Sequence, residues 1–283
     1  MPELTIPFSA GATVGLIAGR GELPAIAART LRAEGRRVVA VGFDEETRAA
    51  LAGEVDEYHD LRLGQVEKLI RAFRAGGVTS ALLLGKVHKA KAFGDFRPDL
   101  RAMRIWMSLP DRRDDTILRA VVDELAREGI AVEEAGRWLG SLFAPPGKLS
   151  RRGPDAREMA DIAFGFRLAR EIGRIDVGQT VVVKQLAPVA VEALEGTDLA
   201  IRRGGEVAGP GTVVVKAAKP GQDMRFDVPV VGLETARSVV AAQASTLAVE
   251  AGRTLFVQRA ESLALLDSRG VALWGFQEGD AGP

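Results

Sequence analysis

The sequence of 283 residues contains no cysteine and only two histidines. Without cysteine the chain has no disulfide and no thiolate metal site, and two histidines are too few for a His-rich metal cage. Carboxylate and other oxygen ligands remain available. Any bound metal is therefore expected to be an oxygen-ligated ion such as Mg²⁺ or Mn²⁺.

An excess of one charge and long apolar runs are also absent. The 38 basic residues balance the 38 acidic ones, so nothing favours nucleic acid or another polyanion as the main partner. No uncharged apolar stretch is long enough to span a membrane, and residues 1–11 have no basic segment followed by an apolar core. We expect a cytoplasmic protein with no spanning helix.

The first half alternates buried strands with helices. Apolar runs at 13–18, 38–43 and 80–84 predict strands, and helical spacing of apolar residues predicts helices at 25–34 and 65–75. Such alternation is typical of a parallel, Rossmann-like sheet with helices on both faces.

Glycines follow two of these strands, where open α/β sheets bind their ligands. Gly19 and Gly21 come after the first strand, and Gly85 with Lys86 comes after the strand at 80–84. These four residues are candidates to receive a nucleotide or a sugar phosphate. The third glycine of the dinucleotide fingerprint is absent, which argues against a nucleotide-dependent oxidoreductase.

Residues 142–155 are rich in Pro, Gly and Arg and have no apolar period, so we place a domain boundary there. The predicted division is an N-terminal Rossmann-like domain at 1–143, a linker at 144–157 and a C-terminal mixed α/β domain at 158–283.

A polar cluster in the second half follows a β-branched strand at 213–215. Its members are Lys216, Lys219, Gln222, Asp223, Arg225 and Asp227. Carboxylates hold a divalent metal and cations hold an anion, so the cluster suits a phosphate site with a metal. Glu195 and Asp198 are further candidate carboxylates, although Thr197 or Asp198 also suits a helix cap. A solvated hairpin rim is the alternative for the main cluster.

Residues 99–108 predict one more helix, with an apolar face of Leu100, Met103 and Met107. A helix face of this kind is typically part of a protein core.

Four motifs, in order along the chain, resemble the LpxI family. They are GLIAGRGELP at 15–24, IGRIDVGQTVVV at 172–183, AVEALEGTD at 190–198 and KAAKPGQDMRFDVPVVG at 216–232. The similarity covers nearly the whole chain. Arg20 departs from the pattern, because a small residue is usual there, and this leaves open how the loop receives its ligand.

The resemblance implies a Mg²⁺-dependent hydrolase of lipid A biosynthesis. It would cleave the pyrophosphate of UDP-2,3-diacylglucosamine into UMP and 2,3-diacylglucosamine 1-phosphate, lipid X, held between two linked domains. The family's essential aspartate corresponds to Asp227. A metal held by carboxylates, together with nearby cations, is sufficient for pyrophosphate hydrolysis.

The roles expected from the resemblance and the cluster fall into three groups. Asp227, Gln222 and Lys219 are candidate catalytic residues. Candidate metal ligands are Asp227, Asp223, Glu195 and Asp198. Candidate substrate-binding residues are Gly19, Gly21, Gly85, Lys86, Thr197, Lys216 and Arg225.

One alternative function and two possible partners remain open at this stage. A non-catalytic lipid or nucleotide carrier would need the pockets but not the carboxylates. The lipid-nucleotide substrate also leaves open peripheral contact with the inner membrane, and the sequence leaves open a homodimer.

Overall fold

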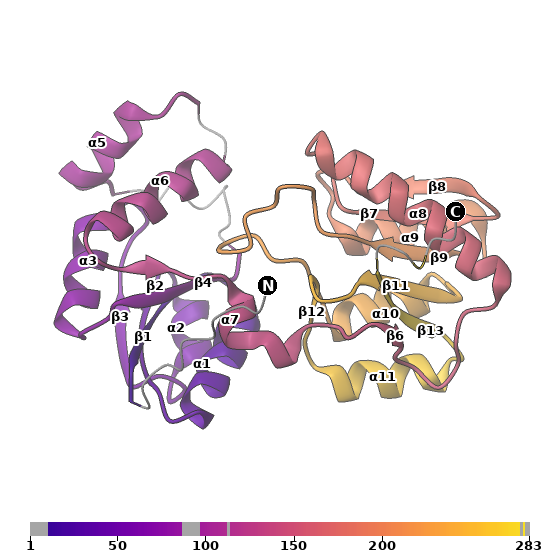
Figure 1. Ribbon diagram of the computed structural model, residues 1–283, viewed down its shortest axis with the longest axis horizontal. Coiled ribbons are helices and arrows are strands. Elements are labelled where there is room, and N and C mark those ends of the chain that lie inside the picture. The colour runs from indigo at the N-terminus through magenta and orange to yellow at the C-terminus, as the bar shows by residue number, and fades with distance from the viewer. Residues whose placement is uncertain (1–10, 87–96, 112–113, 278–279, 281–283) are drawn as a thin grey trace, which may run out of the picture. The chain divides into compact units, whose positions relative to one another are not determined.

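The computed structural model describes residues 11–86, 97–111, 114–277 and 280, and it divides into two units (Figure 1). Unit 1 comprises Met1–Leu139 with Met224–Phe226, and unit 2 comprises Gly140–Asp223 with Asp227–Pro283. A short stretch from late in the sequence thus belongs to the first unit.

Unit 1 is built on a five-stranded parallel sheet in the order β3-β2-β1-β4-β5. Its strands are β1 (Thr13–Ala18), β2 (Arg37–Gly42), β3 (Glu57–Asp60), β4 (Ser80–Leu84) and β5 (Ala131–Val132). Its helices are α1 (Leu23–Ala33), α2 (Glu45–Leu51), α3 (Val66–Ala75), α5 (Leu100–Ser108), α6 (Asp114–Arg127) and α7 (Ala135–Leu139). The Rossmann-like prediction is confirmed.

Burial explains why the central strands are continuous apolar runs. β1, β2 and β4 are covered on both faces, so their side chains are buried with little alternation. One core cluster centres on Phe73 of α3 and Leu125 of α6, and Phe226 packs into the same cluster. The stretch Met224–Phe226 therefore joins unit 1 through an apolar anchor.

Unit 2 contains a six-stranded mixed sheet in the order β6-β13-β11-β9-β7-β8 and a two-stranded parallel sheet of β10 and β12. The strands are β6 (Gly147–Lys148), β7 (Thr180–Lys184), β8 (Ala187–Val191), β9 (Val213–Lys216), β10 (Val230–Val231), β11 (Thr246–Glu250), β12 (Leu255–Phe256) and β13 (Ala272–Phe276). The helices are a 3₁₀ turn (Gly140–Leu142), α8 (Ala156–Arg174), α9 (Thr197–Ala208), α10 (Leu233–Ala241) and α11 (Arg259–Ser268). The mixed α/β prediction for this half is confirmed.

Two apolar layers cover this mixed sheet. Ile162 and Phe166 of α8 pack with Val181 and Val215 in one cluster, while α9, α10 and α11 contribute Ile201, Val239 and Leu266 to another. α8 begins with a capping box, in which Asp155 accepts from the Glu158 N–H and Glu158 accepts from the Asp155 N–H.

The residues predicted as a linker, 144–157, lie within unit 2, and the division between the units falls after Leu139. β6 pairs antiparallel with β13, and the Ser150 hydroxyl accepts a hydrogen bond from the Leu273 N–H at 2.6 Å. The proline- and glycine-rich segment is irregular, but it is hydrogen-bonded to the edge of the six-stranded sheet. No helix in the described ranges is both long and apolar enough to cross a bilayer.

Candidate functional site

The two glycine turns of unit 1 lie against each other at the carboxyl ends of β1 and β4. Gly19 N–H donates to the Leu84 carbonyl at 2.8 Å, and Arg20 and Lys86 exchange backbone hydrogen bonds at 2.8 and 2.9 Å. A Cβ on Gly85 would lie 2.7 Å from the Gly19 carbonyl, and Gly85 has a φ of +94°. Close backbone approach therefore accounts for these two glycines, and it places Gly19, Gly85 and Lys86 together.

Arg20, next to Gly21 in the first glycine turn, makes ion pairs with two carboxylates. Its guanidinium contacts Asp44 at 2.6 Å and Glu46 at 3.1 Å, and Asp44 also caps α2 by accepting from the Thr47 N–H at 2.9 Å. Partial burial raises the pKa of Asp44, but the hydrogen bonds from Arg20 and Thr47 outweigh it, so the pKa lies below its ordinary value. Arg20 is thus a partly buried structural cation as well as a loop residue.

A buried polar chain lies in unit 2 at the end of β9. Lys216 is 5% exposed, and its ammonium donates to the Thr197 hydroxyl at 3.1 Å and to the Val230 carbonyl at 3.0 Å. The Thr197 hydroxyl in turn donates to Glu192 at 3.0 Å, and Glu192 is also buried. The structure thus joins two predicted substrate-binding residues, Lys216 and Thr197, to a carboxylate that the sequence did not single out.

The loop after β9 is fixed at its start by Glu250 at the end of β11. This buried carboxylate accepts from the Ala218 N–H at 2.7 Å and from Arg170 at 3.2 Å. Next in the loop, the Lys219 ammonium contacts Asp176 at 2.6 Å, and the Lys219 N–H donates to the Gln222 side chain at 2.8 Å. The loop is therefore held in place by side chains from α8, β11 and the turn at residue 176.

The main carboxylates come next on this loop. Asp227 N–H donates to the Asp223 carbonyl at 3.0 Å, which closes a single turn between the two aspartates. The residues inside that turn, including Arg225, cluster with unit 1, and Ala135 N–H donates to the Met224 carbonyl at 3.4 Å. Phe226 and Met224 thus attach the middle of the turn to unit 1, and the two aspartates lie at its ends.

The remaining two candidate carboxylates have different surroundings. Glu195 pairs with Arg203 at 2.5 Å and accepts from the Ala193 N–H, and hydrogen bonds from backbone N–H groups and from Arg203 lower its pKa. Asp198 lies in the first turn of α9, and its Oδ1 atom is buried without a hydrogen-bond partner in the structure. Glu195 is therefore already compensated by an arginine, whereas Asp198 retains an unsatisfied acceptor.

Family models for the two halves match nearly the whole chain. The LpxI N-terminal domain matches residues 13–142, and the LpxI C-terminal domain matches residues 145–274. A relative from Caulobacter vibrioides, UDP-2,3-diacylglucosamine pyrophosphatase LpxI, is 34% identical over 275 residues, which are 93% of this chain and 96% of that protein. The chain belongs to the LpxI family. The resemblance inferred from the four motifs is confirmed.

Among solved structures, the biotin carboxylase domain of Hydrogenobacter thermophilus 2-oxoglutarate carboxylase is similar at 14% identity with a TM-score of 0.26. The match covers 62% of this chain and 35% of that one. A likeness this low bears on neither the fold nor the activity of this LpxI family member.

The carboxylates of this family member suit Mg²⁺ only if water and substrate complete the metal's coordination shell. Within the described residues, no three His, Cys, Asp or Glu side chains form a group that could hold a metal ion. Mg²⁺, however, is usually bound through one or two carboxylates, with water and substrate phosphates completing its shell. Asp223 and Asp227 supply two carboxylates on one turn, so they fit such an ion better than Glu195 does.

Sequence reasoning missed Glu192, Glu250 and Asp176, which hold Lys216 and the loop after β9. Glu192 and Glu250 each sit at or just beyond the end of an apolar strand, where a single charged residue usually faces solvent. A charged residue at a strand end next to a candidate site is the one signal that the sequence offered.

Proposed function

We propose that this chain hydrolyses the pyrophosphate of UDP-2,3-diacylglucosamine to UMP and 2,3-diacylglucosamine 1-phosphate, a step of lipid A biosynthesis. The observation that carries the proposal is the match to the named relative over 96% of its length. The turn from Asp223 to Asp227, which contains the aspartate that the resemblance implies to be essential, lies beside the predicted phosphate-binding residues in sequence.

The protein's own groups supply three parts of this chemistry. Lys216 and Lys219 neutralise charge on the phosphate oxygens, because both are cations on or next to the loop after β9. Asp227 orients the attacking water or holds the metal, and Gln222 assists in placing water. Gly19, Gly85 and Lys86 form a second anion-receiving element on the sheet of unit 1.

We propose that Mg²⁺ is the cofactor and that Asp227 and Asp223 hold it. When bound, the ion would neutralise developing charge and polarise the phosphoryl group under attack. Mn²⁺ has similar oxygen preferences and is expected to substitute.

We also propose that the reaction takes place in the cytoplasm at the inner membrane. Two acyl chains keep the substrate in a bilayer, so the enzyme must collect it from that surface.

The test is release of UMP from UDP-2,3-diacylglucosamine by the wild type and by Asp227→Ala, with Mg²⁺ and with EDTA. We expect metal-dependent release that falls roughly a thousandfold or more in the variant, while the variant still binds substrate. Glu261→Ala, an exposed carboxylate in the first turn of α11, is the matched control.

Failure of the folded wild type to release UMP would sink the hydrolase proposal. Retained substrate binding in that case would favour a carrier. Binding of NAD(P) without binding of the UDP-sugar would favour an oxidoreductase.

A further inference from the structure

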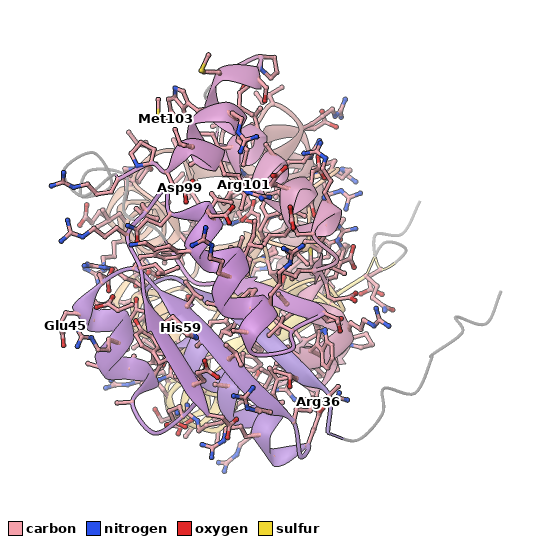
Figure 2. The ribbon with its side chains drawn as sticks, turned by 90° about the vertical axis from the view of Figure 1, so that its left-hand side faces the viewer. Arg36, Glu45, His59, Asp99, Arg101 and Met103 are labelled. Carbon is pink, nitrogen blue, oxygen red and sulfur yellow. The ribbon has the colours of Figure 1, made fainter. Side chains whose placement is uncertain are left out.

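The apolar face of α5 points outward. Leu100 and Met107 are each 79% exposed, Met103 is 47% exposed and Trp106 is 38% exposed, whereas Ala102 is the one buried residue of this helix. Figure 2 shows Met103 on the outer side of α5. We call Leu100, Met103, Trp106 and Met107 the α5 face. The expectation that the face of Leu100, Met103 and Met107 belongs to a core is wrong; α5 joins the core of unit 1 through Ala102 and Ile105 instead.

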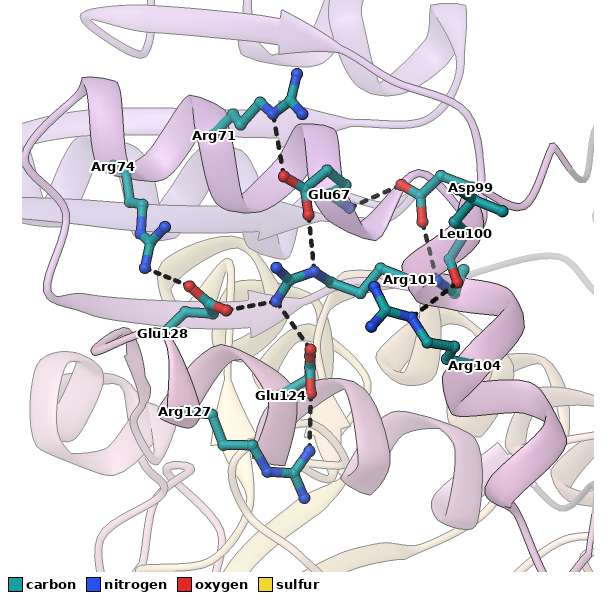
Figure 3. Close-up of polar contacts among 11 residues, drawn as sticks. Glu67, Arg71, Arg74, Asp99, Leu100, Arg101, Arg104, Glu124, Arg127 and Glu128 are labelled. Carbon is teal, nitrogen blue, oxygen red and sulfur yellow. Dashed lines mark hydrogen bonds and ion pairs between the residues drawn. The ribbon is translucent and has the colours of Figure 1, made fainter.

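Polar contacts hold α5 in this orientation. Arg101, on the inner side, contacts Glu67 of α3 at 2.7 Å, Glu124 of α6 at 2.8 Å, and Glu128 just after α6 at 2.5 Å (Figure 3). Asp99 caps α5 by accepting from the Ala102 N–H and also accepts from the Glu67 N–H at 2.7 Å. The helix thus packs through Arg101, Ala102 and Ile105, and the α5 face is left outside.

The sequence around the α5 face is basic, although the chain as a whole has no net charge. Residues 86–113 carry eight Lys or Arg and three Asp, with no Glu. Arg97 and Arg104 flank the α5 face and are exposed, unlike Arg101. Exposed apolar side chains bordered by arginines match the interface of an anionic bilayer, where the apolar groups enter the acyl boundary and the cations meet the headgroups.

We propose that the α5 face is the surface by which this protein docks on an anionic lipid bilayer. The inference deepens the proposed function and rests on it, because an enzyme whose substrate carries two acyl chains must meet a lipid surface. Met, Leu and Trp insert, and Arg97 and Arg104 contact the anionic headgroups. The docking surface is separate in sequence from the loop after β9 that carries Asp227.

A second copy of the chain is a poorer match to the α5 face. A twofold interface places the same patch on both partners. Both partners would then bring Arg97 and Arg104 to the same interface, and like charges at an interface oppose association.

The test is sedimentation of the full chain with vesicles, without substrate. One set contains roughly one part phosphatidylglycerol to three parts phosphatidylethanolamine, and the other is phosphatidylcholine alone. The test variant is Met103→Ser/Met107→Ser. The matched control is Leu186→Ser/Val207→Ser, which removes two apolar side chains of similar exposure in unit 2. Thermal unfolding of each variant verifies that it is folded.

We expect wild type to bind the anionic vesicles more tightly than phosphatidylcholine. The α5 variant should lose affinity by about tenfold or more, and the control should stay within about twofold of wild type. Arg104→Glu should weaken binding to the anionic vesicles alone.

Three results would overturn the proposal. The first is a wild type that does not bind anionic vesicles, and the second is an α5 variant that binds as wild type does. The third is a wild-type dimer that becomes a monomer in the α5 variant, because the α5 face would then be a contact between copies. Since binding is measured without substrate, loss of docking and loss of hydrolysis are read separately.

Discussion

The ammonium of Lys216 lies 3.1 Å from the hydroxyl of Thr197, which links it to the buried carboxylate of Glu192. A buried cation needs a compensating charge or polar partners. Here the carboxylate acts through a hydroxyl, which lies between the ammonium and the carboxylate. The Thr197 hydroxyl thereby fixes the direction of the ammonium.

Glu192→Gln should therefore lower kcat by about tenfold, because the hydroxyl that orients Lys216 loses its charged acceptor. Steady-state hydrolysis with separate kcat and KM values tests this. As a positioning residue, Glu192 should affect kcat more than KM. Glu206→Gln, an exposed carboxylate on α9, is the control. Equal activity of Glu192→Gln and wild type would contradict the role assigned to Glu192.

Gly85→Ala should destabilise unit 1 by about 2 kcal/mol or more, because the new Cβ would meet the Gly19 backbone and the positive φ disfavours alanine. Urea unfolding measures the change. Gly53→Ala is the matched control, since Gly53 also has a positive φ, of +76°, but a Cβ there meets nothing within 4 Å. If the two variants lose equal stability, the close approach of the two turns is not the cause of the loss in Gly85→Ala.

Arg20→Met should reduce stability in a pH-dependent way. The pKa of Asp44 is depressed below its ordinary value of 3.8, so the Arg20 contact stabilises the fold above that pH. The contribution is lost as the pH falls through the lower folded-state pKa. Unfolding free energies of wild type and variant, measured from neutral pH into acid, should converge at low pH. A difference that stays constant into acid would show that Asp44 is not the partner that matters.

Periodicity in the sequence predicted most of the framework. The apolar runs that became β1, β2 and β4 are long and buried on both faces, so local pattern and tertiary environment agree there. Periodicity identifies an apolar face but does not say what covers it, and for that reason the outward direction of the α5 face was missed. The three glutamates around Arg101 lie on α3, on α6 and just after α6, and no local pattern in α5 reveals them.

The sequence indicated which residue types form the candidate site better than it indicated which of those residues are in contact. Lys216 and Thr197 are 19 positions apart, and their contact depends on how β9 and α9 pack. Glu192 follows the end of β8, and the turn at Gly178–Gln179 lies over it: a Cβ on Gly178 would lie 2.1 Å from the Glu192 carbonyl. The spacing of residues along the chain does not predict such long-range contacts.

Asp223→Asn should raise the Mg²⁺ concentration needed for half-maximal hydrolysis by about tenfold, because the turn that also carries Asp227 loses one of its two carboxylates. Titration of activity with Mg²⁺ measures this, and near-normal activity at saturating metal would separate a lost ligand from a lost catalytic group. Glu195→Gln is the informative comparison. Glu195 already pairs with Arg203, so this change should shift the Mg²⁺ requirement by less than about twofold. A larger shift for Glu195→Gln than for Asp223→Asn would move the metal toward the start of α9 and reverse the order in which we rank these carboxylates.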